Sequence, residues 1–434
     1  MDRADSASHN LRALLRRRLS ALLFSRLQKM GRLAEQMGVS AFLVGGLVRD
    51  LLLGRRNFDV DVVIEGDGIA FAVALSRLAG ARVTAHQRFG TAAVVFPDSF
   101  KLDVATARAE SYECPAALPT VVPSSIKDDL SRRDFTINTL AIRLNQPQFG
   151  ELIDLYGGRR DLRERTIRVL HNLSFVEDPT RVFRAIRFEL RFGFRLHKET
   201  RALIKRAVKQ ELFHRLSGHR LLEELILLFS EAKPRKAVAR LSELDLLQFI
   251  HTDLKWSPRL AVLLKTVEHA LGWYRRRCRE RTIDAWLVYF MALMEVVTEK
   301  AVGQTLKRLT VPERQAENIR AGRLASTGIL RRLAKRPLPR PSETYRALTG
   351  FSDETLLFLM AKIKSQTVKR QISAYLTTYR HVKPSLTGTD LKAMGLKPGP
   401  IYKKILGRLL EARLNREINA KALERELVKR MAKI

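Results

Sequence analysis

The chain has 434 residues, of which 46% are hydrophobic, so it can bury substantial cores and should divide into roughly two to four domains. Lysine and arginine number 79 against 45 aspartates and glutamates, and the net charge of +34 favours a nucleic-acid partner over a merely solubilising basic surface. The two cysteines, Cys114 and Cys278, lie far apart in the sequence and exclude a disulfide framework and a thiolate zinc site.

No apolar run reaches the roughly 18 residues that a membrane-spanning helix needs, and the N-terminus lacks the apolar segment of a signal peptide. We therefore expect no membrane partner and a cytoplasmic location. The arginine-rich segment from Leu11 to Leu27 is either a transit peptide or a basic amphipathic surface helix, and we favour the helix. Residues 1–35 are accordingly predicted to form a basic helical extension.

The first distinctive motif is a glycine pair, Gly45 and Gly46, which follows the apolar run Phe42–Val44. Without side chains at a helix start, backbone N–H groups can approach a phosphate. The next predicted strand carries Asp59 and Asp61. Their side chains point to the same face because successive residues of a strand alternate between faces.

Two carboxylates on one face suit Mg²⁺, which prefers one or two carboxylates together with phosphate oxygens. We predict that Asp59 and Asp61 are catalytic metal ligands and that, with the glycine pair, they form a nucleotidyltransferase core. Either motif alone is more typical of a turn or of solvated acids, and their spacing favours the functional interpretation. The glycine pair lacks the Gly-x-Gly-x-x-Gly spacing of a dinucleotide-binding oxidoreductase.

A third carboxylate, Asp103, lies in another alternating segment, Lys101–Ala105. On a neighbouring strand it would complete a two-metal site and help to activate the attacking hydroxyl. The alternative is an exposed acid at a strand end.

The next cluster, Ser131–Ala141, contains two adjacent arginines, Arg132 and Arg133. A guanidinium binds phosphate with two parallel donors and keeps its charge, so this pair suits a triphosphate. Asp134 and Asn138 are polar groups that can bind a ribose hydroxyl. The alternative is an ordinary capped turn with surface arginines.

A third cluster begins at Asp178, which precedes Pro179 and is followed by Arg181. Asp178 is well placed to cap a helix that starts with a proline. A carboxylate beside a guanidinium also matches the donor–acceptor pair that cytosine and adenine share, so the two residues are candidates for base selection without a template. Arg184 and Arg187 follow at helical spacing and are expected to extend from the base site toward a phosphate or the RNA.

The periodicity changes once along the chain. Up to about Ile153 short β-type segments alternate with helical ones, and after Gly157-Gly158 the pattern is almost wholly helical. The fold class is therefore α+β, a small mixed head with a β-sheet and helices, followed by an all-α neck, body and tail. The expected strands are Ala41–Val44, Phe58–Ile64, Thr91–Phe96, Lys101–Ala105 and Thr139–Leu144.

A proline-rich linker at Pro337–Pro341 opens the last section. From Arg331 to Ile434 there are 24 basic and 8 acidic residues, so we expect the tail to bind RNA. The predicted domains are the extension 1–35, the catalytic head 36–153, the neck 154–230 for base recognition, the body 231–336 and the tail 337–434.

These motifs, in this order, resemble class II tRNA nucleotidyltransferases, the family of CCA-adding enzymes and bacterial poly(A) polymerases. The resemblance implies template-independent transfer of AMP or CMP from ATP or CTP to a tRNA 3′ hydroxyl, with Mg²⁺ and release of pyrophosphate. It also implies a head–neck hinge at Asp154–Gly158. The residues expected to contact nucleotide are Gly45, Gly46, Arg49, Arg133, Asp134, Asn138, Asp178, Arg181, Arg184 and Arg187.

Weaker features concern the nucleotide that is added. The segment Ala107–Thr120 occupies the place of a flexible loop needed for adding the terminal A, and Arg215–Arg220 is similar to A-adding enzymes. The sequence leaves open whether the enzyme adds A, CC or CCA, with a poly(A) polymerase acting on general RNA as the alternative. Since relatives often carry CBS and DHH-type modules upstream, the chain is either a short form or a fragment.

Overall fold

The computed structural model describes residues 10–56, 59–111, 119–335 and 337–432. Phe58, Cys114 and the centre of the expected loop Ala107–Thr120 lie outside these ranges, as do the first nine residues of the expected extension. The chain divides into two compact units, Met1–Arg220 and Leu221–Ile434. The α+β fold class is confirmed, because the sheet lies in the first unit and the second unit is helical.

The first unit is built on a seven-stranded sheet with the strand order β3-β4-β5-β2-β1-β8-β9. The central strands β2 and β5 are parallel, and every other neighbouring pair is antiparallel. Buried Val, Ala and Phe side chains along β1 and β2 explain why these segments form the middle of the sheet. The strands are β1 Ser40–Val44, β2 Val60–Glu65, β3 Arg82–His86, β4 Thr91–Val95, β5 Lys101–Thr106, β8 Leu140–Arg143 and β9 Leu152–Asp154.

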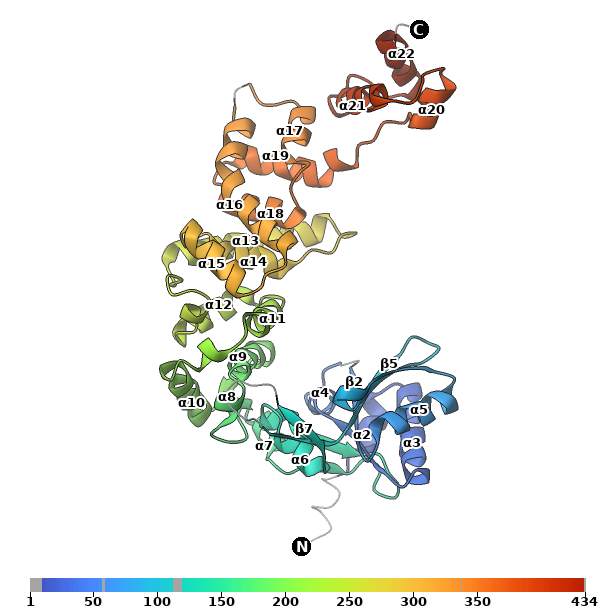
Figure 1. Cartoon of the computed structure of the whole chain (residues 1–434), viewed down its shortest axis with the longest axis vertical. Coiled ribbons are helices and arrows are strands. Elements are labelled where there is room, and N and C mark those ends of the chain that lie inside the picture. Colours follow the sequence, from blue (N-terminus) through green and yellow to red (C-terminus); the bar gives the residue numbers. More distant parts are fainter. Residues whose placement is uncertain (1–9, 57–58, 112–118, 336, 433–434) are drawn as a thin grey trace. The chain divides into compact units, whose positions relative to one another are not determined.

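Two helices, α3 (Ala21–Gln36) and α5 (Gly68–Ala79), pack side by side against the sheet (Figure 1). Both begin with a side-chain cap, since Ser20 accepts a hydrogen bond from Leu23 N and Asp67 one from Ala70 N. A shorter basic helix, α2 (Arg12–Arg18), precedes them. The apolar face of α3 is buried, so this part of the expected N-terminal extension packs on the head.

One hydrophobic core cluster of the first unit contains Phe42, Val63 and Ala141 from the sheet and Leu130 from α6 (Ile126–Ser131). Helix α6 is held at its start by Glu65 of β2, whose carboxylate accepts a 2.6 Å hydrogen bond from Ile126 N. Next to it lies a two-stranded hairpin. The remaining elements of this part are α4 Gly46–Leu52, η1 Gln87–Phe89, β6 Arg108–Ser111, β7 Thr120–Pro123 and η2 Thr136–Asn138.

The segment expected to be a hinge, Asp154–Gly158, connects β9 to α7 (Gly158–Arg163). Asp154 accepts hydrogen bonds of 2.7 and 2.9 Å from the N–H groups of Gly158 and Arg159, which caps α7. A Cβ on Gly158 would lie 2.3 Å from the Thr136 carbonyl oxygen, so only glycine allows this contact. The neck then continues with β10 Thr166–Ile167, α8 Ser174–Glu177, α9 Thr180–Phe192, β11 Arg195–Leu196, α10 Lys198–Lys209, η3 Leu212–Arg215 and α11 Gly218–Phe229.

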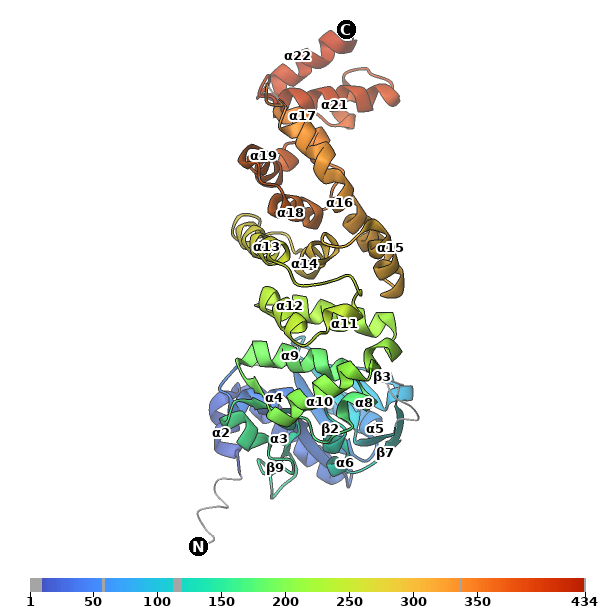
Figure 2. The same cartoon turned by 90° about the vertical axis from the view of Figure 1, so that its left-hand side faces the viewer.

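In the second unit α13, α14 and α18 pack together, and α16 runs beside α14 and α18 (Figure 2). Every residue of α14 from Trp286 to Met294 is buried. In the described part of the chain no helix has the length and apolar character needed to cross a membrane. The helices are α12 Pro234–Glu243, η4 Leu247–Phe249, α13 Pro258–Arg277, α14 Ala285–Met294, α15 Glu299–Arg308, α16 Glu313–Leu333, α17 Pro341–Leu348, α18 Asp353–Lys362, α19 Gln366–Thr377, η5 Tyr379–His381, α20 Gly388–Ala393, α21 Pro400–Leu414 and α22 Lys421–Ala432.

The last three helices have a core of their own, which includes Leu391, Ile405, Leu409 and Val428. Glu424 is fully buried there and accepts hydrogen bonds from the N–H groups of Ser385 and Leu386. This polar contact fixes the segment before α20 against α22.

Candidate active site

Two of the expected catalytic carboxylates lie directly beside each other. Asp61 of β2 and Asp103 of β5 are paired positions of two parallel strands, so their side chains leave the same face of the sheet. Asp61 is half-buried and Asp103 is half-exposed. Asp59 immediately precedes β2 and is exposed. The expectation that Asp103 sits on a strand next to Asp61 is therefore met.

The surroundings of Asp61, its burial first, work against its ionised form. Burial raises the pKa of Asp61 above its ordinary value, and Asp103 and Asp59 raise it further, while Arg133 and Lys101 oppose the shift. Lys101 donates a 2.8 Å hydrogen bond to Asp103, and this bond raises the pKa of the lysine. The site thus gathers three carboxylates with two cations beside them.

Gly45 brings the glycine turn against Arg133. Its φ of +68° is rare for residues with a side chain, and an added Cβ would lie 2.7 Å from Nη1 of Arg133. The turn is held by a 3.1 Å hydrogen bond from Gly45 N to the carbonyl of Leu140, and Gly46 begins α4. The guanidinium of Arg133 therefore lies directly over the turn and within electrostatic reach of Asp61.

A fully buried residue that the sequence did not single out, Asp129, anchors both arginines. It accepts hydrogen bonds from Arg132 (2.6 and 3.1 Å) and from Arg133 (2.8 and 3.3 Å). Burial alone would raise the pKa of Asp129, but the two guanidinium groups outweigh it and hold the pKa below its ordinary value. Arg133 keeps Nη1 toward Gly45, with a long 3.5 Å hydrogen bond to the Asn138 carbonyl.

Asn138 links the head to the neck through buried polar contacts. Its side-chain oxygen accepts a 2.6 Å hydrogen bond from Arg49, and its NH₂ donates a 2.8 Å bond to Asp134. Asp134 also accepts hydrogen bonds of 2.9 and 2.8 Å from Arg184 of α9. Burial opposes the ionised form of Asp134, but Arg184 and Asn138 keep its pKa below the ordinary value.

The outer ends of this network are also fixed. Arg49 pairs with Asp50 through two hydrogen bonds of 2.9 and 3.0 Å and stacks on Phe192. Arg187, one turn beyond Arg184 on α9, is 9% exposed. Arg49, Asn138, Asp134 and Arg184 thus act together to position the head against α9.

Asp178 and Arg181, the expected base-selecting pair, have different partners in this structure. Oδ1 of Asp178 accepts bonds from the N–H (3.0 Å) and hydroxyl (2.6 Å) of Thr180 and from Arg220 (2.8 Å). Arg181 donates to the hydroxyl of Ser174 at 2.9 Å and to the carbonyl of Arg132 at 2.8 Å. Asp178 therefore caps α9, and Arg181 joins α9 to the end of α6 beside Arg133.

The donor set fits a divalent cation. Burial and the nearby carboxylates of Asp103 and Asp59 raise the proton affinity of Asp61, and a cation between the three would relieve the repulsion. Among the described residues no three acidic, histidine or cysteine side chains converge into a complete metal cage. An arrangement of this kind needs further oxygen ligands, and phosphate groups of a nucleotide supply them.

Sequence reasoning missed three contributors to the site: Asp129, Lys101 and Arg220 as the partner of Asp178. Asp129 precedes Arg132 and Arg133 by three and four residues, which is the helical spacing of an ion pair, so the signal was present. The contact between Arg220 and Asp178 spans 42 residues and has no such local signal.

The parallel acidic pair, the glycine turn and the anchored arginines define a nucleotidyltransferase head. Two family models match the chain: the poly A polymerase head domain at residues 41–168, and the probable RNA and SrmB-binding site of polymerase A at residues 193–256.

Relatives extend this match over almost the whole chain. An A-adding tRNA nucleotidyltransferase of Geobacter sulfurreducens is 46% identical over 96% of this chain, which spans about half (48%) of that relative's length. Another, of Halalkalibacterium halodurans, is 34% identical over 92% of this chain and 90% of the relative. A solved CCA-adding enzyme in an apo form superposes with a TM-score of 0.79 and 32% identity, covering 98% of this chain and 99% of that one. The chain belongs to the tRNA nucleotidyltransferase and poly(A) polymerase family, as the sequence motifs predicted.

Proposed function

We propose that this chain is a tRNA nucleotidyltransferase that adds the terminal A to the 3′ end of tRNA from ATP. The observation that carries the proposal is the paired position of Asp61 and Asp103 beside the turn at Gly45 and the guanidinium of Arg133. The names of the Geobacter and Halalkalibacterium relatives support AMP as the added group. They also favour tRNA over general RNA as the acceptor.

In the proposed reaction the tRNA 3′ oxygen attacks the α-phosphorus of ATP, and the bond from that phosphorus to the bridging oxygen breaks. Pyrophosphate leaves and the hydroxyl proton is lost. Asp103 lies beside Asp61 and is assigned to orient the attacking hydroxyl. Arg133 and the N–H group of Gly46 are assigned to the triphosphate, whose negative charge they oppose, and Gly45 shapes the turn that presents them.

Asp59 and Asp61 are proposed to hold Mg²⁺. When bound, the cation would neutralise phosphate oxygens and lower the pKa of the 3′ hydroxyl. The carboxylates fit this task because burial and the charges of Asp103 and Asp59 all oppose the ionised form of Asp61, and a bound cation would offset them.

Base selection is proposed for Asp178 and Arg181, with Arg184 and Arg187 on the same helix. One carboxylate oxygen of Asp178 is fixed by Thr180 and Arg220, which orients the other oxygen for the exocyclic amino group of adenine or cytosine. Arg49, Asp134 and Asn138 are proposed to support the nucleotide site by keeping α9 in place.

The tail is proposed to bind tRNA through backbone phosphates. Residues 383–434 carry 13 lysines and arginines against 5 acidic residues. Helices α20, α21 and α22 have a common core and form one basic element.

A single assay tests the proposed activity. The protein is incubated with labelled ATP or CTP and with tRNA ending at the discriminator base, at C or at CC. We expect one AMP to be added to tRNA ending in CC, and no CMP to be added to the other two. Addition of CMP would assign CC or CCA synthesis instead, and long AMP tracts on an unrelated RNA would assign polyadenylation.

A further inference from the structure

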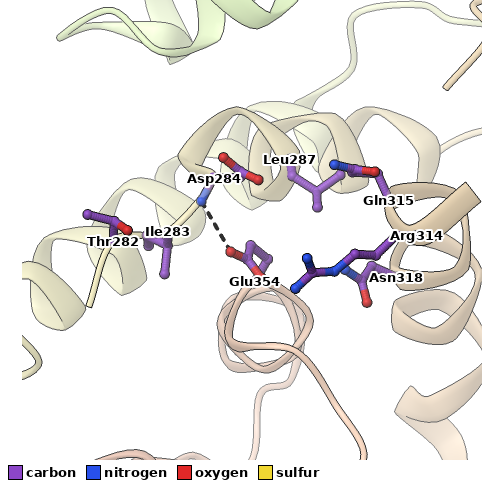
Figure 3. A pocket seen from close by; sticks show the side chains of 8 residues that line it. All are labelled: Thr282, Ile283, Asp284, Leu287, Arg314, Gln315, Asn318 and Glu354. Atoms are coloured by element: carbon purple, nitrogen blue, oxygen red, sulfur yellow. Dashed lines mark hydrogen bonds between the residues drawn. The ribbon is translucent and has the colours of Figure 1, made fainter. Parts of the chain in front are cut away.

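The second unit contains a polar cavity of about 240 Å³ that lies outside the site described above. It lies where three helices begin, α14, α16 and α18 (Figure 3). Arg314 and Asn318 face it from α16, and Glu354 faces it from the first turn of α18. Asp284 and Leu287 line it from α14 and the residue before that helix.

Opposite charges face this cavity without pairing. Within the described part of the chain, the guanidinium of Arg314 and the carboxylate of Asp284 take part in no hydrogen bond or ion pair. The nearby Arg320 of the same helix, in contrast, pairs with Glu313 at 2.7 Å. One carboxylate oxygen of Glu354 accepts a 3.1 Å hydrogen bond from Asp284 N. Its other oxygen takes part in no hydrogen bond within the described part of the chain. The cavity thus offers both donors and acceptors to a ligand.

The wall that carries Glu354 is fixed before any ligand binds. Its neighbour Asp353 accepts hydrogen bonds of 2.9 and 2.7 Å from Arg380 and one of 2.5 Å from the hydroxyl of Tyr274. Ser352 caps α18 through the N–H of Thr355. Because these contacts set the start of α18, the carboxylate of Glu354 is presented from a rigid helix end.

A strongly basic segment directly precedes the cavity-lining residues in the sequence. Five arginines lie between residues 275 and 281, all exposed, and Thr282 and Asp284 of the cavity follow at once. Arg281 lies 3.8 Å from Asp353, which ties this segment to the cavity wall. Exposed arginines at this density suit the phosphates of a nucleic-acid strand.

We propose that the cavity binds an unstacked guanine of an RNA strand, with the flanking phosphates on the arginine segment. Guanine presents two neighbouring N–H donors on one edge, which one carboxylate accepts together, and two acceptors, O6 and N7, which one guanidinium binds. Asp284, whose carboxylate has no partner among the described residues, supplies the first contact and Arg314 the second. Adenine, cytosine and uracil have neither of these two pairs. If the RNA is tRNA, the inference rests on the function proposed above and adds a contact outside the head.

The test uses the full chain and fluorescently labelled pentanucleotides, UUGUU, UUAUU and UUCUU, with binding measured by anisotropy at fixed salt. We expect UUGUU to bind at least about fivefold more tightly than the other two, the lower end of what a bidentate contact gives. Arg314→Ala and Asp284→Asn should each remove this preference. Arg331→Ala, which changes an exposed arginine of the same helix away from the cavity, should leave it intact.

Three results would overturn the inference. One is equal affinity for all three pentanucleotides. Another is a uniform loss of affinity in Arg314→Ala, which means phosphate binding alone. The third is binding of free GMP as tight as that of UUGUU, which assigns the cavity to a free nucleotide. Failure of the proposed function is seen separately, as absence of AMP addition by the unmodified chain, whereas Arg314→Ala should keep the turnover number of that reaction.

Discussion

The carboxylate of Asp178 accepts a 2.8 Å hydrogen bond from the guanidinium of Arg220, 42 residues further along the chain. Arg181, which follows Asp178 by three residues, donates instead to Ser174 and to the carbonyl of Arg132. The bonds that Asp178 accepts from Thr180 and Arg220 all converge on Oδ1. For Arg181 to pair with a base beside Asp178, it must share or exchange one of its present partners.

This geometry separates two roles of Asp178. Asp178→Ser keeps an oxygen that can cap Thr180 N but loses the carboxylate, whereas Asp178→Ala loses both. We expect Ser to restore thermal stability relative to Ala, and both variants to lose about ten- to a hundredfold in ATP incorporation or in discrimination against GTP and UTP. Incorporation of the four nucleotides and the melting temperature are the measurements. Full activity of the Ser variant would show that Asp178 acts only as a helix cap and does not select the base.

Asp61 should be essential for turnover and unfavourable for stability. Its raised pKa means that the ionised side chain costs folding free energy at neutral pH, so Asp61→Asn should raise the melting temperature slightly. The same change should lower AMP transfer by at least about a hundredfold, since metal ligation contributes several kcal/mol, and Asp59→Ala should do likewise. Asp98→Asn alters a surface ion pair with Arg26 and serves as the control. Near-normal activity of Asp61→Asn would contradict the site assignment.

Gly45→Ala tests the contact between the glycine turn and Arg133. The positive φ alone should cost about 1–3 kcal/mol of stability, and the added Cβ should also displace Nη1 of the arginine. Gly38→Ala is a matched control, because Gly38 has a φ of +67° but no atom within 4 Å of the added Cβ. We expect both variants to be destabilised, and only Gly45→Ala to raise the KM for ATP. Equal KM values for ATP in the two variants would contradict the assignment of Arg133 to the triphosphate.

The sequence predicted the elements whose residues have one dominant pattern. The strands with Asp61 and Asp103 were expected within one or two residues of their observed ends, because β5 alternates between buried and exposed positions and β2 is a short run of mostly buried β-branched residues. Strand β3 was not expected, because most of its residues are exposed and it lies at a sheet edge. Strand β9 has three residues, too few for a periodicity.

The residues of the candidate site also fall into those that the sequence predicted and those that it did not. Motifs placed Gly45, Asp61 and Arg133 together, since each belongs to a short local pattern. The partners that orient them are set by the folded chain. Arg220 reaches Asp178 only because the start of α9 and the first turn of α11 come together in space. Long-range pairs of this kind leave no spacing in a single sequence.

The ion pair between Asp134 and Arg184 predicts a dependence on pH. Because the pKa of Asp134 is lowered, its contribution to stability is complete above the ordinary value of 3.8 and is lost as the pH falls through the lower value in the folded state. In Arg184→Gln burial would dominate and raise that pKa. The variant should be about 1–3 kcal/mol less stable at pH 7, and the difference should shrink below about pH 4. Urea unfolding at both pH values measures it, with Arg201→Gln, an exposed arginine of α10, as the control. A difference independent of pH would contradict this role.

The tail can be tested by a deletion that keeps the packed helices α13, α14, α16 and α18, although it removes the contacts of α21 with α17. Removal of everything after Pro341 would also remove α18, which packs against α13 and α14, and so would disrupt the core. Removal of residues 383–434 takes away α20, α21 and α22 with their common core and leaves α18 in place.

We expect this shorter deletion to raise the KM for tRNA and to leave the KM for ATP unchanged. The slope of log affinity against log salt should become shallower by about 0.7 to 0.9 for each phosphate that the protein no longer binds. The triple change Lys397→Gln, Lys403→Gln and Lys404→Gln in the full chain should shift the slope in the same direction and keeps the α20–α22 core intact, because none of these lysines belongs to it. An unchanged KM for tRNA and an unchanged slope in both proteins would assign the tail to solubility alone.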